Sequence, residues 1–395
     1  MPKRTTPSSR RRRRWRIEHA DCLKALPKLA PESVDAIITD PPYGIGISGM
    51  AWDGSAIRAA ARTDLKQREK HGTARRNRGC SAFGNPSSYA GSYDSSQAGL
   101  LAFQTFSARW AAECLRVLKP GGHMAVFGGP RTFHRLACGV EEAGFELRDV
   151  LMWIFGQGFP KSLNLTGPAK GWGTALKPAY EPILLARKPL QGTTAQNHAR
   201  HRTGALHIDA CRVGASNRKC PAEGRAHNPA RAASPSGRWP ANLTLIHAPS
   251  CTSERCDRDC PAGLLGERQR FFYAAKASRA EREAGCEQLA RKTVQTFQIG
   301  RENDKRAREN PVCNIHPTVK PIELMRWLVR LLTPTGGLVL DPFAGSGSTG
   351  AAAVLEGACF LGIEREDSYI PIARARIRYW ARAAGAGREP AGRCR

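Results

Sequence analysis

Four consecutive residues, Asp40, Pro41, Pro42 and Tyr43, have the types and spacing for chemistry on an aromatic amine. The amino nitrogen of a nucleic-acid base is a poor nucleophile because its lone pair is delocalised into the ring. Two acceptors aimed at its two N–H bonds would localise that lone pair, and the Asp40 carboxylate and the Pro41 carbonyl can supply them. The prolines stiffen the backbone, and the Tyr43 ring offers a face on which an extruded base can stack. The simpler alternative is a strand that two prolines stop, with a capping aspartate.

A glycine-rich stretch from Asp341 to Gly350 is the second chemical signal. Glycines let the backbone approach a ligand closely, and the N-terminus of the following helix offers free N–H groups. Glu364 ends the next predicted strand, where a carboxylate would hold the two hydroxyls of a ribose. No lysine follows the glycines, so the stretch is not a phosphate-binding P-loop. The pattern indicates an adenosine-containing cofactor, with tight strand-to-helix packing as the alternative.

The elements that must position these residues alternate between strands and helices. Periodicity predicts strands at 34–39, 123–127, 150–155, 181–186, 337–340 and 359–363, and helices at 103–118, 132–143, 322–332, 351–355 and 368–382. This alternation is typical of an α/β fold with a doubly wound sheet. Two stretches interrupt it: residues 49–101, rich in Gly, Ser and Arg, and residues 190–310, rich in Arg, His, Pro and Cys. We expect a flexible insertion in the first and a separate recognition region in the second.

The composition indicates a polyanionic partner. The chain has 395 residues and a formal net charge of +27, which favours nucleic acid. No apolar run approaches the roughly 20 residues of a membrane-spanning helix. The Arg-rich start leads into Trp15 without the apolar stretch of a signal peptide. We therefore expect a cytoplasmic protein that binds nucleic acid and no membrane.

The 13 cysteines are an odd number scattered along the chain, which favours reduced thiols or a metal site over a disulfide framework. His247, Cys251, Cys256 and Cys260 are close enough in sequence to hold one tetrahedral Zn²⁺. Their spacing is irregular, so ordinary thiols are the favoured interpretation. We expect no bound metal, with these four residues as the weak candidate.

The motifs together resemble the amino-group DNA methyltransferases, which modify adenine N6 or cytosine N4, in their permuted β-type arrangement. In that family Asp-Pro-Pro-Tyr is the catalytic motif and precedes the cofactor motif Phe-x-Gly-x-Gly, as 40–43 precede 343–347 here. Residues 20–23 (ADCL) are similar to the acidic motif near the cofactor adenine, and residues 316–321 (HPTVKP) to the motif beside the methionine moiety. The motifs keep the order of the family, and the resemblance covers most of the chain.

The resemblance implies a Rossmann-like, S-adenosylmethionine-dependent methyltransferase fold, circularly permuted and with an inserted target-recognition region. Its catalytic half would be 15–48 with 102–189 and its cofactor half 311–383, with a basic tail at 1–14, the flexible insertion at 49–101, the recognition region at 190–310 and a tail at 384–395. The strands ending at Asp40 and Asp341 would lie side by side and open onto one cleft. The residues implied in catalysis are Asp40, Pro41, Pro42 and Tyr43, and those implied in binding S-adenosylmethionine are Asp21, Cys22, Asp40, His316, Thr318, Lys320, Asp341, Phe343, Gly345, Ser346, Gly347, Ser348, Thr349 and Glu364.

The implied activity is methyl transfer to adenine N6 in double-stranded DNA, with base flipping and direct in-line displacement. Asp at the first motif position resembles the adenine group, whereas most cytosine-N4 enzymes have Ser, and cytosine N4 stays open as the alternative. Cytosine-C5 chemistry needs a Pro-Cys pair, and no cysteine here follows a proline. An RNA methyltransferase and a non-catalytic DNA-binding protein are further alternatives.

Four shorter segments resemble a subgroup common in phages and prophages: residues 158–162, 177–182, 237–242 and 270–273. They suggest a phage-type enzyme, with a restriction endonuclease partner or as an orphan without one. The basic residues of 10–14 and 190–310 are the expected DNA contacts, most of them to phosphates. The sequence does not indicate an oligomeric state.

Overall fold

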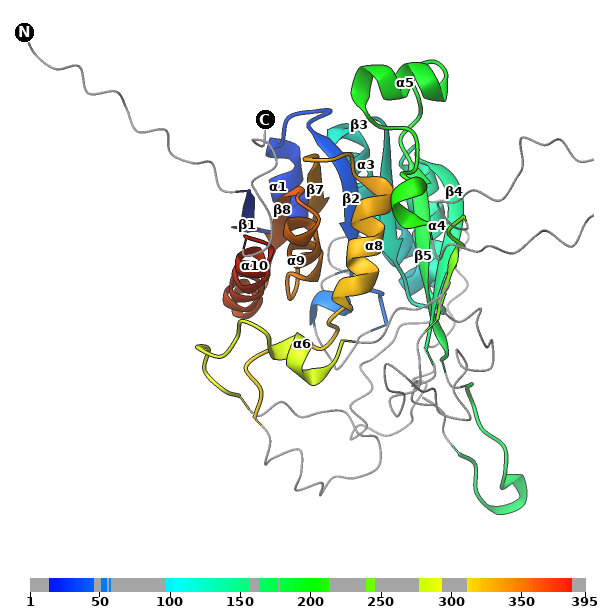
Figure 1. Cartoon of the computed structure of the whole chain (residues 1–395). Helices are drawn as coiled ribbons and strands as arrows, with labels where there is room; N and C mark the ends of the chain where they lie inside the picture. The colour runs from blue at the N-terminus through cyan, green and yellow to red at the C-terminus, as the bar shows by residue number, and fades with distance from the viewer. Residues whose placement is uncertain are drawn as a thin grey trace, which may run out of the picture.

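The β-branched run before the two prolines forms the central strand of the sheet. Strand β2, Val34–Thr39, has all six residues buried, as expected for an apolar strand that is covered on both faces. The structure is a computed structural model, and it describes residues 14–45, 51–54, 57, 97–155, 164–176, 178–212, 239–245, 277–292 and 311–385. Figure 1 shows β2 inside one sheet that lies between two layers of helices.

The sheet has eight strands in the order β1-β8-β7-β2-β3-β5-β4-β6. Neighbouring strands are parallel except where β5 pairs with β3 and β4. The other strands are β1 Trp15–His19, β3 Leu118–Phe127, β4 Glu146–Ile154, β5 Tyr180–Arg187, β6 Leu243–Leu245, β7 Leu338–Asp341 and β8 Cys359–Glu364. The predicted α/β class and Rossmann-like methyltransferase fold are confirmed.

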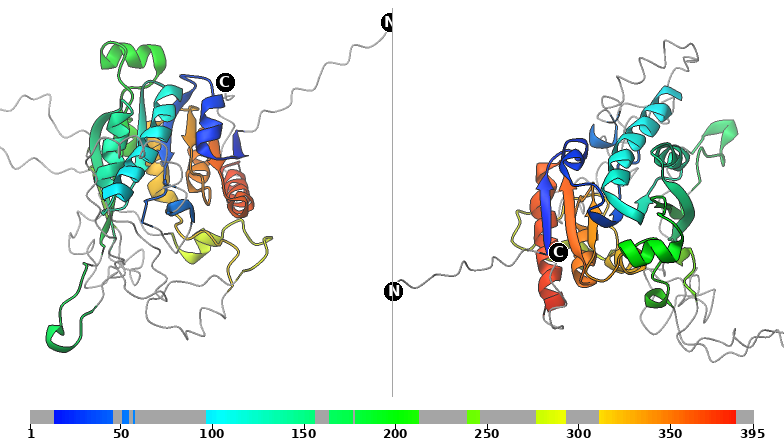
Figure 2. Two further views of the ribbon diagram at one scale, coloured as in Figure 1. Left: turned by 180° about the vertical axis from the view of Figure 1, so that it is seen from behind. Right: turned by 90° about the horizontal axis from the view of Figure 1, so that it is seen from above.

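Helices cover both faces of this sheet (Figure 2). Side chains of α8 (Ile322–Leu332), α9 (Ser348–Leu355) and α10 (Ile370–Gly385) share one core with Ala36 and Ile38 of β2. Side chains of α1 (Cys22–Ala25), α3 (Gln97–Val117) and α4 (Phe133–Glu142) share a second core with Ile37. Successive side chains of a strand point to opposite faces, so β2 contributes to both cores.

The predicted juxtaposition of two strands that are distant in sequence is present. β2 pairs in parallel with β7, with Ala36 opposite Val339 and Ile37 opposite Leu340. The chain leaves β2 through α3 on one face and leaves β7 through α9 on the other face. The C-terminal ends of β2 and β7 therefore meet at a topological switch point, where ligands of such sheets bind.

Several elements differ from the periodicity prediction. α3 begins at Gln97, before the expected start at 103, so the end of the expected 49–101 insertion is helical. β1 was not predicted, and it pairs with β8 at one edge of the sheet. α5 (Thr194–His201) was also missed because it is polar and lacks an apolar stripe. It is held instead by a capping box and by Asn197, whose amide donates to the Pro120 carbonyl at 3.0 Å.

Described parts of the 190–310 region pack into this domain. β6 pairs in parallel with the end of β4, and Cys211 lies in the same core as α8. Helix α6 (Arg279–Glu283) lies close to the loop before α8 (Figure 1). The role of the region in target recognition stays a prediction. Among the helices that the structure describes, none has the length and apolar character needed to cross a bilayer.

Candidate active site

The predicted site residues converge on one pocket, although they come from five separate segments. These segments are the turn after β1, the loop after β2, the loop before α8, the loop after β7 and the end of β8. Gly347 is the exception, and it lies at the N-cap of α9. The predicted residues that line the pocket are Asp21, Cys22, Asp40, Pro41, Pro42, Tyr43, His316, Thr318, Lys320, Asp341, Phe343, Gly345, Ser346, Ser348, Thr349 and Glu364.

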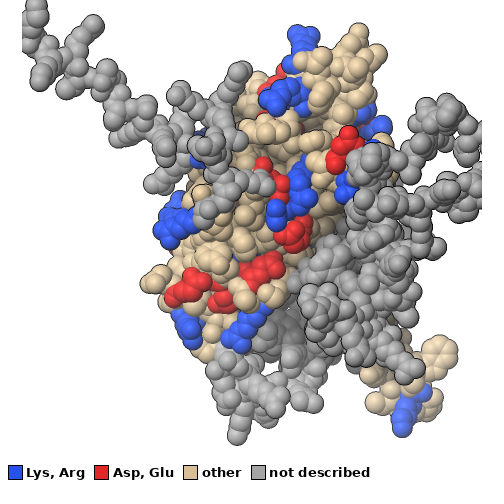
Figure 3. Space-filling model, in the orientation of Figure 1, with Lys and Arg blue, Asp and Glu red and all other residues tan. Residues whose placement is uncertain are grey.

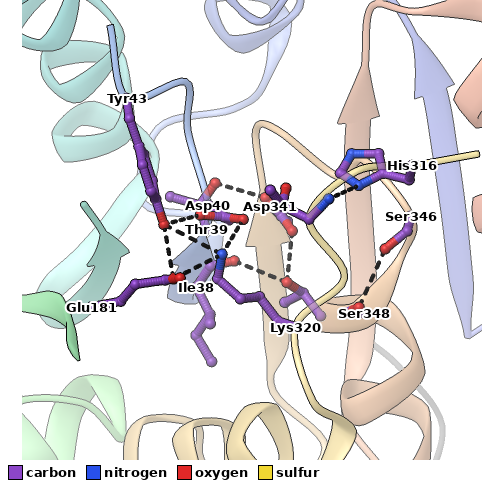
Figure 4. Close-up of polar contacts among 12 residues, drawn as sticks. Ile38, Thr39, Asp40, Tyr43, Glu181, His316, Lys320, Asp341, Ser346 and Ser348 are labelled. Atoms are coloured by element: carbon purple, nitrogen blue, oxygen red, sulfur yellow. Dashed lines mark hydrogen bonds and ion pairs between the residues drawn. The ribbon is translucent and has the colours of Figure 1, made fainter. Parts of the chain in front are cut away.

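The Asp40 carboxylate belongs to a four-residue polar cluster (Figure 4). Lys320 Nζ donates to Asp40 Oδ2 at 2.6 Å, and Tyr43 Oη donates to Asp40 Oδ1 at 2.9 Å. Glu181, from the start of β5, lies 3.2 Å from both Tyr43 Oη and Lys320 Nζ through its Oε2. The Lys320 ammonium also lies 4.9 Å from the centre of the Phe127 ring. The cluster is thus one ammonium and one phenol shared by two carboxylates.

Burial and charge act in opposite directions on these groups. Burial raises the pKa of Asp40 above its ordinary value, and the neighbouring Lys320 ammonium offsets only part of this rise. Burial lowers the pKa of Lys320, but the Asp40 and Glu181 carboxylates outweigh it and leave this pKa above its ordinary value. The pKa of Tyr43 is also raised, first by burial and then by the same two carboxylates. Lys320 therefore stays protonated and Tyr43 stays neutral at physiological pH.

Asp341 ends the neighbouring strand β7 and has neutral partners. Thr39 Oγ1 donates to its Oδ1 at 2.7 Å, and Thr349 Oγ1 donates to its Oδ2 at 2.6 Å. The backbone N–H of Phe343 donates to Oδ1 at 3.0 Å. Burial raises the pKa of Asp341 to about 6, although these hydrogen bonds oppose the rise. Asp341 therefore joins the end of β2 to the glycine-rich loop and to the start of α9.

The glycine-rich loop packs directly against the residues before α8. Gly345 has φ +48°, and a Cβ at this position would lie 2.6 Å from His316 Nε2. The backbone N–H of Gly345 donates to Glu364 Oε2 at 2.7 Å. His316 Nδ1 accepts from the Thr318 N–H at 3.3 Å, and burial lowers the pKa of His316 to about 3. The imidazole is therefore neutral, and only glycine fits at position 345.

Asp21 and Cys22 reach the same pocket because β1 pairs with β8. Ala20 donates its N–H to the Glu364 carbonyl at 2.9 Å, which sets the start of α1 beside the end of β8. Asp21 caps α1 by accepting from the Leu23 N–H at 2.9 Å. Burial raises the pKa of the Cys22 thiol to about 12, so this thiol is not a nucleophile.

The charges that line the pocket suit a cationic ligand. Five acidic side chains line it against two basic ones, and the buried imidazole is neutral. A phosphate would meet repulsion here, whereas a sulfonium with an ammonium would meet attraction. Aromatic and aliphatic side chains that can enclose an adenine line the same pocket: Trp52, Ile57, Phe106 and Tyr369. The residues therefore fit S-adenosylmethionine.

Sequence reasoning missed two polar residues of this site. Glu181 was predicted only as the first residue of a strand and as part of the segment 177–182, and a polar residue at the start of an apolar strand was the available signal. Arg376 was hidden among the arginines of α10. Its side chain is fully buried, and its Nη1 donates to the Ser346 carbonyl at 2.8 Å and to the Ser348 hydroxyl at 3.1 Å. Arg376 thus holds the glycine-rich loop in place through these hydrogen bonds.

The metal candidate is not tested by this geometry. His247, Cys251, Cys256 and Cys260 all lie outside the described residues. Within the described ranges, no group of three or more His, Cys, Asp and Glu side chains could hold a metal ion. The free thiols in these ranges are Cys22, Cys114, Cys138, Cys211, Cys286 and Cys313.

Known proteins resemble the chain over nearly its full length. The DNA methylase family model matches residues 34–375. The type II methyltransferase M.HindIII of Haemophilus influenzae is 25% identical over 386 residues, which cover 91% of this chain and 94% of that protein. The type II methyltransferase M2.DpnII of Streptococcus pneumoniae is 22% identical over 366 residues, which cover 91% of this chain and 88% of that protein.

Solved structures that resemble the chain have lower sequence identity to it. The crystal structure of M1.HpyAVI is 16% identical with a TM-score of 0.42, and the match covers 92% of this chain and 98% of that one. The cytosine-N4-specific PvuII DNA methyltransferase is 15% identical with a TM-score of 0.48, and the match covers 95% of this chain and 93% of that one. From the family match and the site geometry, the chain belongs to the DNA methylase family of N6-adenine and N4-cytosine methyltransferases, and S-adenosylmethionine is its cofactor.

Proposed function

We propose that this chain methylates adenine N6 in double-stranded DNA. The observation that carries the proposal is the Asp40 carboxylate, which lies in the same pocket as the glycine-rich loop of the neighbouring strand β7. A base amine on the Asp40 side and a cofactor on the Gly345 side would meet where these two strands end. The enzyme would gain most of its rate from holding the two reactants in this orientation.

Asp40 acts in this mechanism as the acceptor that activates the amine. An ionised carboxylate has about four acceptor positions, and Lys320 and Tyr43 use two of them. One N–H of the amine takes the place of the Tyr43 hydroxyl on Asp40 Oδ1, and the Pro41 carbonyl takes the second N–H, which localises the nitrogen lone pair. When bound, S-adenosylmethionine would supply an electrophilic methyl carbon here, with its sulfur leaving as a neutral thioether when the S–CH3 bond breaks. Asp40 then receives the proton that the methylated nitrogen loses, and no covalent enzyme intermediate forms.

Tyr43 provides the surface on which the flipped base stacks. The backbone around it is fixed, because Thr132 Oγ1 donates to the Tyr43 carbonyl at 2.7 Å and Asp53 Oδ1 accepts from the Gly44 N–H at 2.7 Å. Pro41 and Pro42 restrict the backbone that precedes the ring. A base extruded from the duplex would replace its lost stacking with this ring.

The cofactor contacts follow from the same pocket. Glu364 is the acceptor for the ribose hydroxyls, and its second oxygen is already oriented by the Glu366 N–H at 2.8 Å. We expect Asp21, Cys22 and Phe343 to contact the adenine and the neutral His316 and Thr318 to contact the methionine moiety, and all five line the pocket. The remaining members of the proposed set shape the loop: Asp341, Gly345, Ser346, Gly347, Ser348 and Thr349. Lys320 belongs to the same set and lines the pocket, and its ammonium also contacts Asp40.

Adenine is proposed over cytosine because of Asp40. A carboxylate at the first position of the motif resembles the adenine enzymes of the family, whereas serine resembles most cytosine-N4 enzymes. The test is to incubate the protein with unmethylated duplex DNA and S-adenosylmethionine, digest the product to nucleosides and separate N6-methyladenine from N4-methylcytosine. Product that is only N4-methylcytosine would overturn the adenine assignment. Methylation of RNA but not of DNA would overturn the substrate class.

DNA binding is expected to rest on phosphate contacts. On the face drawn in Figure 3, basic and acidic side chains of the described residues are interspersed. Most of the arginines and lysines of the 190–310 region lie outside the described residues. A basic protein that neutralises several phosphates loses affinity steeply as salt rises. Fluorescence anisotropy with a labelled duplex should therefore give a Kd that increases strongly with salt, and a constant Kd would contradict a phosphate-dominated interface.

A further inference from the structure

We propose that Glu181 is a positioning residue of this active site, which accepts the Tyr43 hydroxyl when the target amine occupies Asp40 and holds Lys320 between the two carboxylates. The proposal rests on the proposed function, because it assumes that an amine competes for Asp40.

The Tyr43 hydroxyl has one hydrogen and two acceptors. Its oxygen lies 2.9 Å from Asp40 Oδ1 and 3.2 Å from Glu181 Oε2. A phenol donates a single hydrogen bond, so it can serve only one of these carboxylates at a time. A small rotation of this O–H therefore transfers the hydrogen bond from Asp40 to Glu181 without moving the ring.

The Lys320 ammonium has three hydrogens and three partners. They are Asp40 Oδ2 at 2.6 Å, Glu181 Oε2 at 3.2 Å and Tyr43 Oη at 3.3 Å. All three donors are thus used within the cluster. The Glu181 carboxylate holds the Lys320 ammonium from a second side. The ammonium therefore leaves part of the Asp40 carboxylate open to the target amine.

The backbone holds Glu181 in this place. It is the second residue of β5, opposite Trp153 of β4. The next residue, Pro182, accepts the Gly128 N–H through its carbonyl at 3.0 Å. Glu181 is therefore attached to a strand that is paired on both sides, and its carboxylate projects toward the Asp40 cluster (Figure 4). This rigidity suits a residue that must present an acceptor at a fixed point.

Without the Glu181 carboxylate, both donors would remain on Asp40. The amine would then have to displace a hydrogen bond from a charged acceptor before its lone pair could be localised. Loss of one such bond corresponds to about a 10- to 100-fold fall in rate. The effect should appear in kcat rather than in cofactor affinity, because the cluster lies on the base side of the pocket.

Glu181→Gln tests the proposal because the amide keeps the shape of the side chain but replaces the charged acceptor by a neutral one, which competes less well with Asp40 for the Tyr43 hydroxyl. The expected result is a 10- to 100-fold lower kcat with an unchanged Kd for S-adenosylmethionine. In a Tyr43→Phe background, where the ring remains and the competing hydroxyl is gone, the same substitution should lower kcat by a clearly smaller factor.

The pH profile gives a second measurement. Removing the negative charge of Glu181 should move the acidic limb of the kcat–pH profile to lower pH, because Glu181 raises the pKa of Asp40.

Glu146→Gln is the matched control. Glu146 is paired with Arg187 at the other end of β5, at 2.6 Å, and does not line the pocket. This variant should keep the wild-type kcat and the wild-type acidic limb. A Glu181→Gln enzyme within twofold of wild type, or a loss that is the same with and without the Tyr43 hydroxyl, would overturn the proposal. Wild-type protein that makes no N6-methyladenine would instead overturn the proposed function.

Discussion

Two aspartates end neighbouring parallel strands at the centre of the sheet, and their surroundings differ. Asp341 is held by the hydroxyls of Thr39 and Thr349 and by a backbone N–H. Asp40 is held by the ammonium of Lys320 and by the Tyr43 phenol. Neutral donors fix a carboxylate in place, whereas an adjacent ammonium also lowers its pKa and so favours its ionised form against the effect of burial. The same residue type at the C-terminal ends of neighbouring strands can therefore be structural on one strand and chemical on the next.

The largest expected effect is that of Asp40→Ala on the rate of methyl transfer. The contact that Asp40 makes with the amine is proposed to strengthen in the transition state, so kcat should fall by about 10³-fold or more. The Kd for S-adenosylmethionine should change little, and Lys320 would keep Glu181 as its partner. Single-turnover transfer of labelled methyl groups measures the first quantity and calorimetry the second. An active Asp40→Ala enzyme would contradict the catalytic role of Asp40.

Asp341→Ala should instead act on stability. It leaves two buried hydroxyls without their acceptor and opens a small cavity, which together should cost about 3 kcal/mol of unfolding free energy. Urea unfolding of Asp341→Ala and of Asp40→Ala gives the loss of unfolding free energy for each aspartate. Equal losses of stability in the two variants would contradict the division of roles.

The free energy of unfolding should depend on pH in a way that reflects the raised pKa of Asp341. Its folded-state pKa is raised from 3.8 to about 6, so the unfolded chain ionises first as pH rises. The contribution of Asp341 is therefore greatest below about pH 4 and is lost as pH rises through about 6, by about 3 kcal/mol in total. The unfolding free energy of wild type minus that of Asp341→Asn should fall over this range. A difference that does not vary with pH would mean that the Asp341 carboxyl is not perturbed.

The smallest expected effect is that of Thr349→Val. Valine has the shape of threonine but cannot donate to Asp341 Oδ2, so the variant should lose about 1 kcal/mol of stability and keep its kcat at saturating cofactor. Thr349→Ser, which keeps the hydroxyl, is the matched control and should lose less. Thermal melts and methyl-transfer assays on the two variants would show whether the hydroxyl or the methyl group carries the effect.

The sequence predicted those parts of the site in which one local pattern determines one position. The β-branched run of 34–39 and the helical spacing of 322–332 coincide with the bounds of β2 and α8. Glu364 was placed at the end of a strand for the same reason. The Lys320–Glu181 contact could not be predicted, because it depends on the register of β5 and on the path of a loop. Arg376 was missed because arginines that are buried and exposed look alike in a helical sequence.

The pairing of β2 with β7 also affects how the chain can fold. During synthesis β2 emerges early, but its partner at Leu338–Asp341 is made about three hundred residues later. Until then one edge of the central strand has no partner, and unpaired apolar edges favour association with other chains. Contacts this distant in sequence slow folding, because a long loop must close before they form. The permuted order thus makes the nascent chain dependent on its last segment, and truncation before β7 should yield aggregates rather than a smaller domain.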